Sequence, residues 1–204
     1  MEQPRKKQKL LTPVNMCMVA IFTALIALAG TVLKIPLPPP MPPITTQFFF
    51  CAMAGLLLGS KLGALSVLLY VLLGLVGLPI FTTGGGIGYI FMPTFGYLIG
   101  FIFCAFLVGF VREKAERSKN GLKLPHIFIG CFLGLITSYL FGVVHLYLIK
   151  NFYTHDGISF FTAVQVGMLI FIVQDTLWCA VVSVVGKRFL SAIRSLDRRF
   201  QTTR

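Results

Sequence analysis

The sequence predicts an all-α membrane protein with six transmembrane helices. Hydrophobic residues make up 56% of the 204 residues and charged residues only 12%, whereas a soluble domain carries about 25% charged residues. The mean hydropathy is +0.87, and the apolar residues form runs near the length of a bilayer span. No stretch between these runs is long enough for a separate soluble domain.

Each apolar run predicts one helix. The predicted helices cover about residues 14–33, 46–59, 62–78, 92–111, 126–149 and 161–185. The second is short for a bilayer, so we expect it to tilt or to end below the outer surface. The predicted organisation is a basic cytoplasmic tail at residues 1–13, a six-helix transmembrane domain at 14–185 and a second basic cytoplasmic tail at 186–204.

The basic residues predict the orientation in the membrane. With an inside N-terminus, six spans place sixteen of the eighteen Lys and Arg residues on the cytoplasmic side, leaving Lys34 and Lys150 outside. This asymmetry agrees with the positive-inside rule. Basic residues on the cytoplasmic side are also suited to contact with anionic lipid. We therefore expect a multi-pass protein of the cytoplasmic membrane with both termini cytoplasmic, in contact with the lipid bilayer. Despite the net charge of +12, no nucleic-acid partner is expected, because the basic clusters flank apolar runs.

Enzymatic and metal-binding functions are not indicated. The five cysteines fall inside apolar runs without paired spacing, and the three histidines lack ligand spacing. We find no nucleophile–base pair and no phosphate-binding lysine motif, so neither catalysis, a metal nor a cofactor is expected. A membrane scaffold without cargo remains an alternative, and it would show no ligand-dependent thermal shift.

The chain carries one carboxylate deep inside an apolar run, Asp175. An acid at the middle of a span costs about 2.5–3.5 kcal/mol on insertion scales, so it usually faces the protein interior or a cavity. Asp175 therefore predicts a polar ligand in a membrane-embedded pocket.

Two predicted outside segments are unusual. Residues 34–47 contain six prolines and form a stiff strap, which either caps a pocket or is a turn that resists collapse. Residues 78–97 contain a glycine cluster beside Tyr89 and Tyr97. Glycine lets the main chain approach a ligand and leaves N–H groups free to donate. The uncharged part of this loop is expected to fold back into the bundle; the alternative is a flexible external loop.

Small residues recur at four-residue spacing and predict close helix packing. For the glycine rows, such as Gly55/Gly59/Gly63 and Gly96/Gly100, internal packing is the favoured interpretation. Ala20 and Ala24 differ, since a lipid-facing stripe of small residues is suited to docking a partner protein.

Residues 35–109 resemble the BioY family, the biotin-binding S components of energy-coupling factor (ECF) transporters. The resemblance rests on the segments IPLPPP, TTQFFFCAMAGLLLGSKLGALSVLLYVLLGLVGLPIF, TTGGGIGY and PTFGYLIGF, and it returns at GMLIFIVQD. It implies a six-helix S-component bundle, a ligand pocket open to the outside and biotin capture. It also implies that Ala20 and Ala24 dock an ECF transmembrane coupling protein, which is joined to ATPase subunits.

Biotin suits the candidate residues. Its ureido N–H groups match a carboxylate such as Asp175, and its apolar ring matches Tyr89, Phe81 and Phe91. The expected substrate-binding residues are Asp175, Tyr89, Gly84, Gly85, Gly86, Gly88, Thr83, Gln47 and Trp178.

One position departs from the family pattern. In the family a lysine commonly follows the aspartate by three residues, but Trp178 stands there in this sequence. Three alternatives follow: backbone amides replace that lysine, Lys34 or Lys150 reaches into the pocket, or the specificity has moved to another vitamin or a biotin precursor.

The first apolar run also has features of a cleavable signal peptide, which would leave five spans. The family resemblance extends over about 170 residues and includes this run, which favours a retained helix.

Overall fold

The computed structural model describes residues 12–38, 41–118 and 121–202, and most of them are helical. The long helices are α1 (Pro13–Thr31), α2 (Gln47–Leu58), α3 (Ser60–Val76), α4 (Phe95–Arg117), α5 (Leu124–Leu148) and α7 (Ile172–Thr202). Shorter elements are the strands β1 (Lys34–Ile35) and β2 (Ile44–Thr45), η1 (Ile87–Phe91), η2 (Ile149–Tyr153), α6 (Phe160–Val164) and η3 (Gln165–Leu169).

Every predicted apolar run falls on a helix, with differences at two places. Helix α4 continues to Arg117, because Arg112 and Glu116 form an ion pair one turn apart at 3.0 Å. The last run is divided into α6, η3 and α7, and α7 then continues to Thr202. Helix α7 thus continues past residue 185, so the predicted second tail (186–204) begins as part of the same helix. Outside the described residues lie positions 1–11 of the predicted first tail (1–13), Lys119, Arg204 and the side chains of residues 194–202.

Within the residues that the structure describes, four helical segments are long and apolar enough to cross a membrane. They are Pro13–Thr31, Phe95–Arg117, Leu124–Tyr153 and Phe160–Ile193. Helices α2 and α3 are apolar but shorter. At 1.5 Å per residue, the 12 residues of α2 extend roughly 18 Å, against about 30 Å for the hydrocarbon core of a bilayer.

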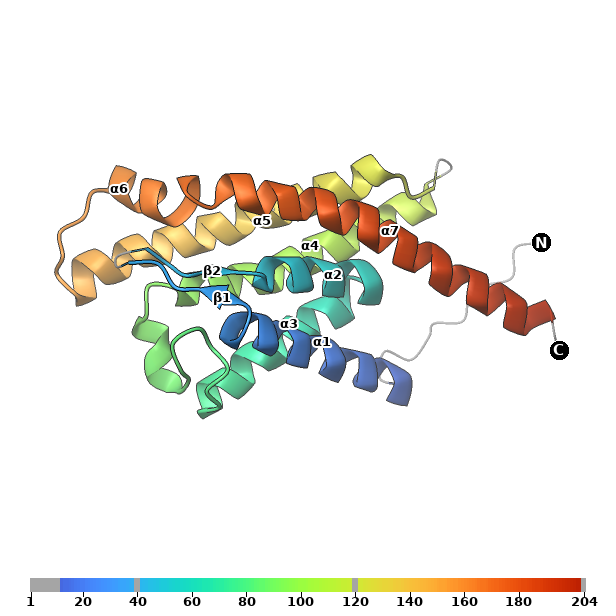
Figure 1. The fold of residues 1–204 in the computed structure, drawn as a ribbon, viewed down its shortest axis with the longest axis horizontal. Coiled ribbons are helices and arrows are strands. Elements are labelled where there is room, and N and C mark those ends of the chain that lie inside the picture. The colour runs from blue at the N-terminus through green and yellow to red at the C-terminus, as the bar shows by residue number, and fades with distance from the viewer. Residues whose placement is uncertain (1–11, 39–40, 119–120, 203–204) are drawn as a thin grey trace.

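Successive long helices run in alternating directions (Figure 1). The start of α1, the junction of α2 and α3, the connection from α4 to α5 and the end of α7 lie at one end of the bundle, on the right in Figure 1. The strand pair, the loop after α3 and the connection from η2 to α6 lie at the opposite end. Lys34 on β1 and Lys150 on η2 belong to the second end, whereas Lys61 at the start of α3 and Arg117 at the end of α4 belong to the first.

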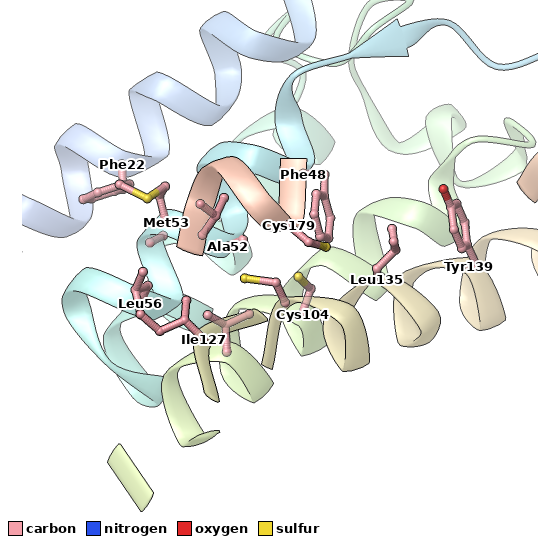
Figure 2. Packing of buried hydrophobic residues seen from close by; sticks show 14 of the residues in the cluster. Phe22, Phe48, Ala52, Met53, Leu56, Cys104, Ile127, Leu135, Tyr139 and Cys179 are labelled. Carbon is pink, nitrogen blue, oxygen red and sulfur yellow. The ribbon is translucent and has the colours of Figure 1, made fainter. Parts of the chain in front are cut away.

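The core joins side chains from α1, α2, α4, α5 and α7 (Figure 2). Its buried members include Phe48, Leu56, Cys104, Leu135 and Cys179. Glycine allows the helices to approach this closely. A Cβ atom on Gly55 would lie 2.1 Å from the Ala105 carbonyl oxygen, and one on Gly100 would lie 2.5 Å from Ser138 Cα. Internal packing is thus the role of these glycine rows, as predicted.

The α2–α3 junction is held by charged residues of α4. Glu113 Oε1 accepts hydrogen bonds from Ser60 N at 2.7 Å and Ser60 Oγ at 3.0 Å, which caps the start of α3. Arg112 Nη1 donates to the carbonyl oxygens of Leu56 and Leu57, which caps the end of α2. Each charge lies at the helix end whose dipole it complements, so the junction keeps its main-chain groups paired.

The proline-rich strap forms a short antiparallel hairpin. Lys34 pairs with Thr45, and Ile35 pairs with Ile44. The hairpin leads directly into α2, whose first residue is Gln47. It therefore places Pro42, Pro43 and Thr45 over the end of the bundle that holds the cavity described below.

Candidate functional site

A cavity in the described part of the bundle lies between Asp175 and the loop that follows α3. We call it the inner cavity; it is lined by Pro42, Pro43, Thr45, Gln47, Phe48, Thr82, Tyr89, Thr94, Tyr97, Leu98, Phe101, Leu135, Ser138, Tyr139, Gly167, Phe171, Gln174 and Asp175. The strap thus caps a pocket, which decides between the two alternatives for residues 34–47. Asp175 is the one charged residue in this lining, as far as the structure describes the chain.

Asp175 is positioned by α7 and by a tyrosine of α5. Tyr139 Oη donates a hydrogen bond to Asp175 Oδ2 at 2.7 Å. Asp175 also lies in the first turn of α7, where the positive end of the helix dipole favours a negative charge. A carboxylate oxygen accepts more than one hydrogen bond, so Asp175 keeps acceptor capacity toward the cavity.

The helix is broken just before Asp175. Residues Gln165–Leu169 form a π-helical turn, η3, and α7 begins only at Ile172. Tyr97 Oη donates to the Gly167 carbonyl at 2.7 Å, so a side chain of α4 satisfies the irregular backbone. Such π-turns occur frequently at functional sites, and irregular backbone at membrane depth is tolerated where it lines a cavity. Gly167 and Phe171 contribute to the lining because of this break.

The loop between α3 and α4 forms the facing wall. Tyr89 is buried on η1, and its hydroxyl lies 2.7 Å from Thr82 Oγ1 and 3.0 Å from Thr94 Oγ1. The loop therefore folds back into the bundle, as expected. Gln47 completes this side: it is 2% exposed, and its Nε2 donates to Tyr70 Oη at 2.8 Å.

The glycine cluster of this loop has a different position from the one expected. Gly84, Gly85, Gly86 and Gly88 do not line the inner cavity, nor do they line the second cavity described below. Gly84 N–H donates to the Phe81 carbonyl and Gly86 N–H to the Gly74 carbonyl, so these amides are occupied by the protein. A Cβ atom on Gly85 would lie 2.1 Å from the Leu78 carbonyl oxygen. The cluster folds the loop over the end of α3, and Thr82 and Tyr89 reach the cavity instead.

Three aromatic candidates also lie outside the inner lining. Trp178 packs on Phe49, with ring centroids 5.2 Å apart, and its indole N–H is buried without a hydrogen-bond partner among the described residues. Phe81 is buried against Tyr70 and Tyr89 in the core. Phe91 is exposed and stacks on Tyr153.

A second cavity of about 370 Å³ adjoins the first, and we call it the rim cavity. It shares Pro42, Pro43, Thr82 and Thr94 with the inner cavity. Thr83, a predicted site residue, lies here together with Lys34 and Lys150. Both lysines therefore face the approach to the inner cavity.

The sequence did not predict several polar lining residues, chiefly Thr82, Thr94, Ser138, Tyr139 and Gln174. The available signal was the polar character of Ser138, Tyr139 and Gln174 within apolar runs. Ala20 and Ala24, the predicted docking residues, are both exposed on α1.

Comparison with known proteins identifies the family. A model described as the BioY family matches residues 4–195. The chain belongs to the BioY family. A protein of Lysinibacillus sphaericus named "Probable biotin transporter BioY" is 38% identical over 181 residues, which is 89% of each chain. The "Biotin transporter BioY" of Thermotoga maritima is 38% identical over 82% of this chain and 90% of its own.

A solved structure has the same fold. The S-component for biotin from an ECF-type ABC transporter, known from a crystal structure, aligns with a TM-score of 0.74 and 30% identity. The alignment covers 89% of this chain and 95% of that chain. The family resemblance expected from the sequence is thereby confirmed.

Proposed function

We propose that this chain is the substrate-binding component of a biotin uptake system in the cytoplasmic membrane. Its membership of the BioY family and its likeness to an S-component for biotin support this function. The observation that carries it is the inner cavity, in which Asp175 faces apolar and hydroxyl-bearing walls. Transporters of this kind bind and move their ligand unchanged, so no enzymatic step belongs to the proposal.

Biotin matches the polarity of this cavity. Its ureido group offers two N–H donors, which an ionised Asp175 accepts through short, charge-assisted hydrogen bonds. The ureido carbonyl needs a donor. The hydroxyl groups of Tyr89, Thr82 and Thr94 are joined by two hydrogen bonds, which leaves one of their three hydrogens free to donate. Phe48, Phe101 and Phe171 offer apolar surface to the fused rings. Small-ligand pockets generally combine such apolar walls with few polar contacts.

The orientation follows from the distribution of charge. We assign the end that carries Lys61, Arg112, Lys187 and their basic neighbours to the cytoplasm. The strap and the cavity then face the outside, and both termini lie inside. In this arrangement all six long helices lie in the membrane, and the shorter α2 and α3 form a pair whose junction lies at the cytoplasmic end.

Transport against a gradient requires an energy source, and the chain carries no phosphate-binding lysine motif. We propose an ECF transmembrane coupling protein with ATPase subunits as partners, docking on the exposed Ala20–Ala24 face of α1. Small side chains on a lipid-facing helix allow such close helix–helix contact.

Equilibrium binding of labelled biotin to the purified protein tests this function. We expect saturable binding that unlabelled biotin abolishes and riboflavin, thiamine and folate do not. Dethiobiotin is included because Trp178 replaces the family's lysine. Displacement by dethiobiotin but not by biotin would assign the site to a biotin precursor, and displacement by neither would reject the proposal.

A further inference from the structure

The rim cavity contains two cations that the proposed function does not yet use. Its lining consists of Lys34, Pro36, Leu37, Met41, Pro42, Pro43, Thr82, Thr83, Met92, Pro93, Thr94, Leu146 and Lys150. Apart from the two lysines, these residues are apolar or carry a hydroxyl group. Within the described chain, no acidic residue lines this cavity. A cationic cavity with low-dielectric walls attracts anions strongly.

Lys34 lies where the two cavities meet. Its Nζ donates a hydrogen bond to the carbonyl oxygen of Thr82, a residue that lines both cavities. Its backbone is held by pairing with Thr45, which lines the inner cavity. The strand pair therefore holds the backbone of Lys34, and the loop that carries Tyr89 holds its ammonium group.

The two lysines differ in how their charge is balanced. Lys150 Nζ binds Asp156 Oδ2 at 2.6 Å, and Thr154 Oγ1 donates to the same carboxylate oxygen at 2.9 Å. Lys34 forms no ion pair with any acidic side chain in the described part of the chain. An ammonium group has three donors, and the Thr82 carbonyl uses one of them. Lys34 thus retains an unbalanced charge and free donors at the cavity junction.

The negative and positive charges of the site lie at opposite ends of the two joined cavities. Asp175 lies in the inner cavity, and the lysines lie toward the rim. Such a site suits an elongated ligand with N–H donors at one end, an apolar middle and an anion at the other end. Biotin has this distribution, with its ureido group at one end and its carboxylate at the other.

We propose that Lys34 binds the carboxylate of the ligand at the cavity junction and that Lys150 adds positive charge from the rim. This inference rests on the proposed function, since it assigns the second polar end of the same ligand. It supplies a cation from the strap, whereas α7 carries Trp178 and no basic residue three positions after Asp175. Lys34 is accordingly a specificity-determining residue that selects acids over their neutral analogues.

The test compares biotin with biotin carboxamide, which keeps the ureido group and the rings but lacks the negative charge. The wild-type protein should bind biotin about 10- to 100-fold more tightly than the amide, as expected for one charge-assisted hydrogen bond. Lys34→Met should lower the ratio of the two affinities to about one, largely by weakening the binding of biotin. Lys34→Arg should retain the preference for biotin. Lys150→Met should reduce the preference partially. Lys61→Met is the matched control, because Lys61 is an exposed lysine that lines neither cavity.

Several outcomes would overturn the inference. Equal binding of acid and amide by the wild-type protein would do so without any variant, and therefore independently of how the variants fold. A Lys34→Met protein that weakens both ligands equally would show that Lys34 only supports the loop through Thr82. The proposed function fails separately, if the wild-type protein binds neither ligand.

Discussion

At the scale of single residues, the site depends on one acid and the groups that orient it. Asp175 receives the Tyr139 hydroxyl at 2.7 Å and lies in the first turn of α7. Both features orient the carboxylate toward the cavity, and its ionised form accepts hydrogen bonds from N–H donors. A buried acid in a span is costly, and a ligand that pairs with it offsets part of that cost.

We predict that Asp175→Asn weakens biotin binding by about 10- to 100-fold, because the charge-assisted bonds to the ureido group become neutral ones. Equilibrium binding to purified protein measures the change. Glu116→Gln is the matched control, since it neutralises an acid at the opposite end of the bundle. Unchanged affinity in Asp175→Asn would remove this residue from the ligand contacts.

At the scale of elements, the loop between α3 and α4 contains both a glycine that the packing requires, Gly85, and one that it does not, Gly88. A Cβ atom on Gly85 would lie 2.1 Å from the Leu78 carbonyl oxygen, whereas one on Gly88 would meet nothing within 4 Å. Gly88 also lacks a positive φ angle. The two positions therefore predict opposite responses to the same substitution.

Gly85→Ala should lower the free energy of unfolding by about 1–3 kcal/mol, as overpacking typically does. It should also weaken biotin binding, because Thr82 and Tyr89 belong to the same loop. Gly88→Ala should leave both properties close to wild type. Thermal unfolding in detergent and the binding assay report the two effects. Equal sensitivity at both positions would contradict the packing role assigned to Gly85.

The same loop has features that the sequence predicts and others that only the folded structure reveals. The apolar runs predict the helices, and the position of Asp175 inside one of them predicts a pocket within the membrane. The absence of charge from the loop predicts its return into the bundle. These sequence features do not reveal that Gly84 and Gly86 use their N–H groups on neighbouring carbonyls, because those partners exist only after the loop has folded. Likewise, Tyr139 reaches Asp175 from α5 across 36 positions of sequence. Such a contact depends on helix packing, which periodicity and spacing do not encode.

At the scale of the whole molecule, binding and transport should depend on different surfaces. Ala20 and Ala24 are exposed on α1 and line neither cavity. Ala20→Leu with Ala24→Leu should therefore leave biotin binding unchanged, since leucine is as soluble in lipid as alanine. Transport should fall at least tenfold in cells that contain the coupling partners, because bulky side chains prevent close helix contact.

Ala180→Leu provides the comparison for this double variant, since Ala180 is an exposed alanine on α7. Its uptake of labelled biotin should match that of the wild-type protein. Wild-type uptake by the α1 double variant would show that docking occurs elsewhere.

An experimental structure of the protein with bound biotin tests the central claim most directly. We predict the ureido group within hydrogen-bond distance of Asp175, the fused rings against Phe48, Phe101 and Phe171, and the carboxylate at Lys34. Biotin bound outside the inner cavity, or bound there with no contact to Asp175, would contradict the account.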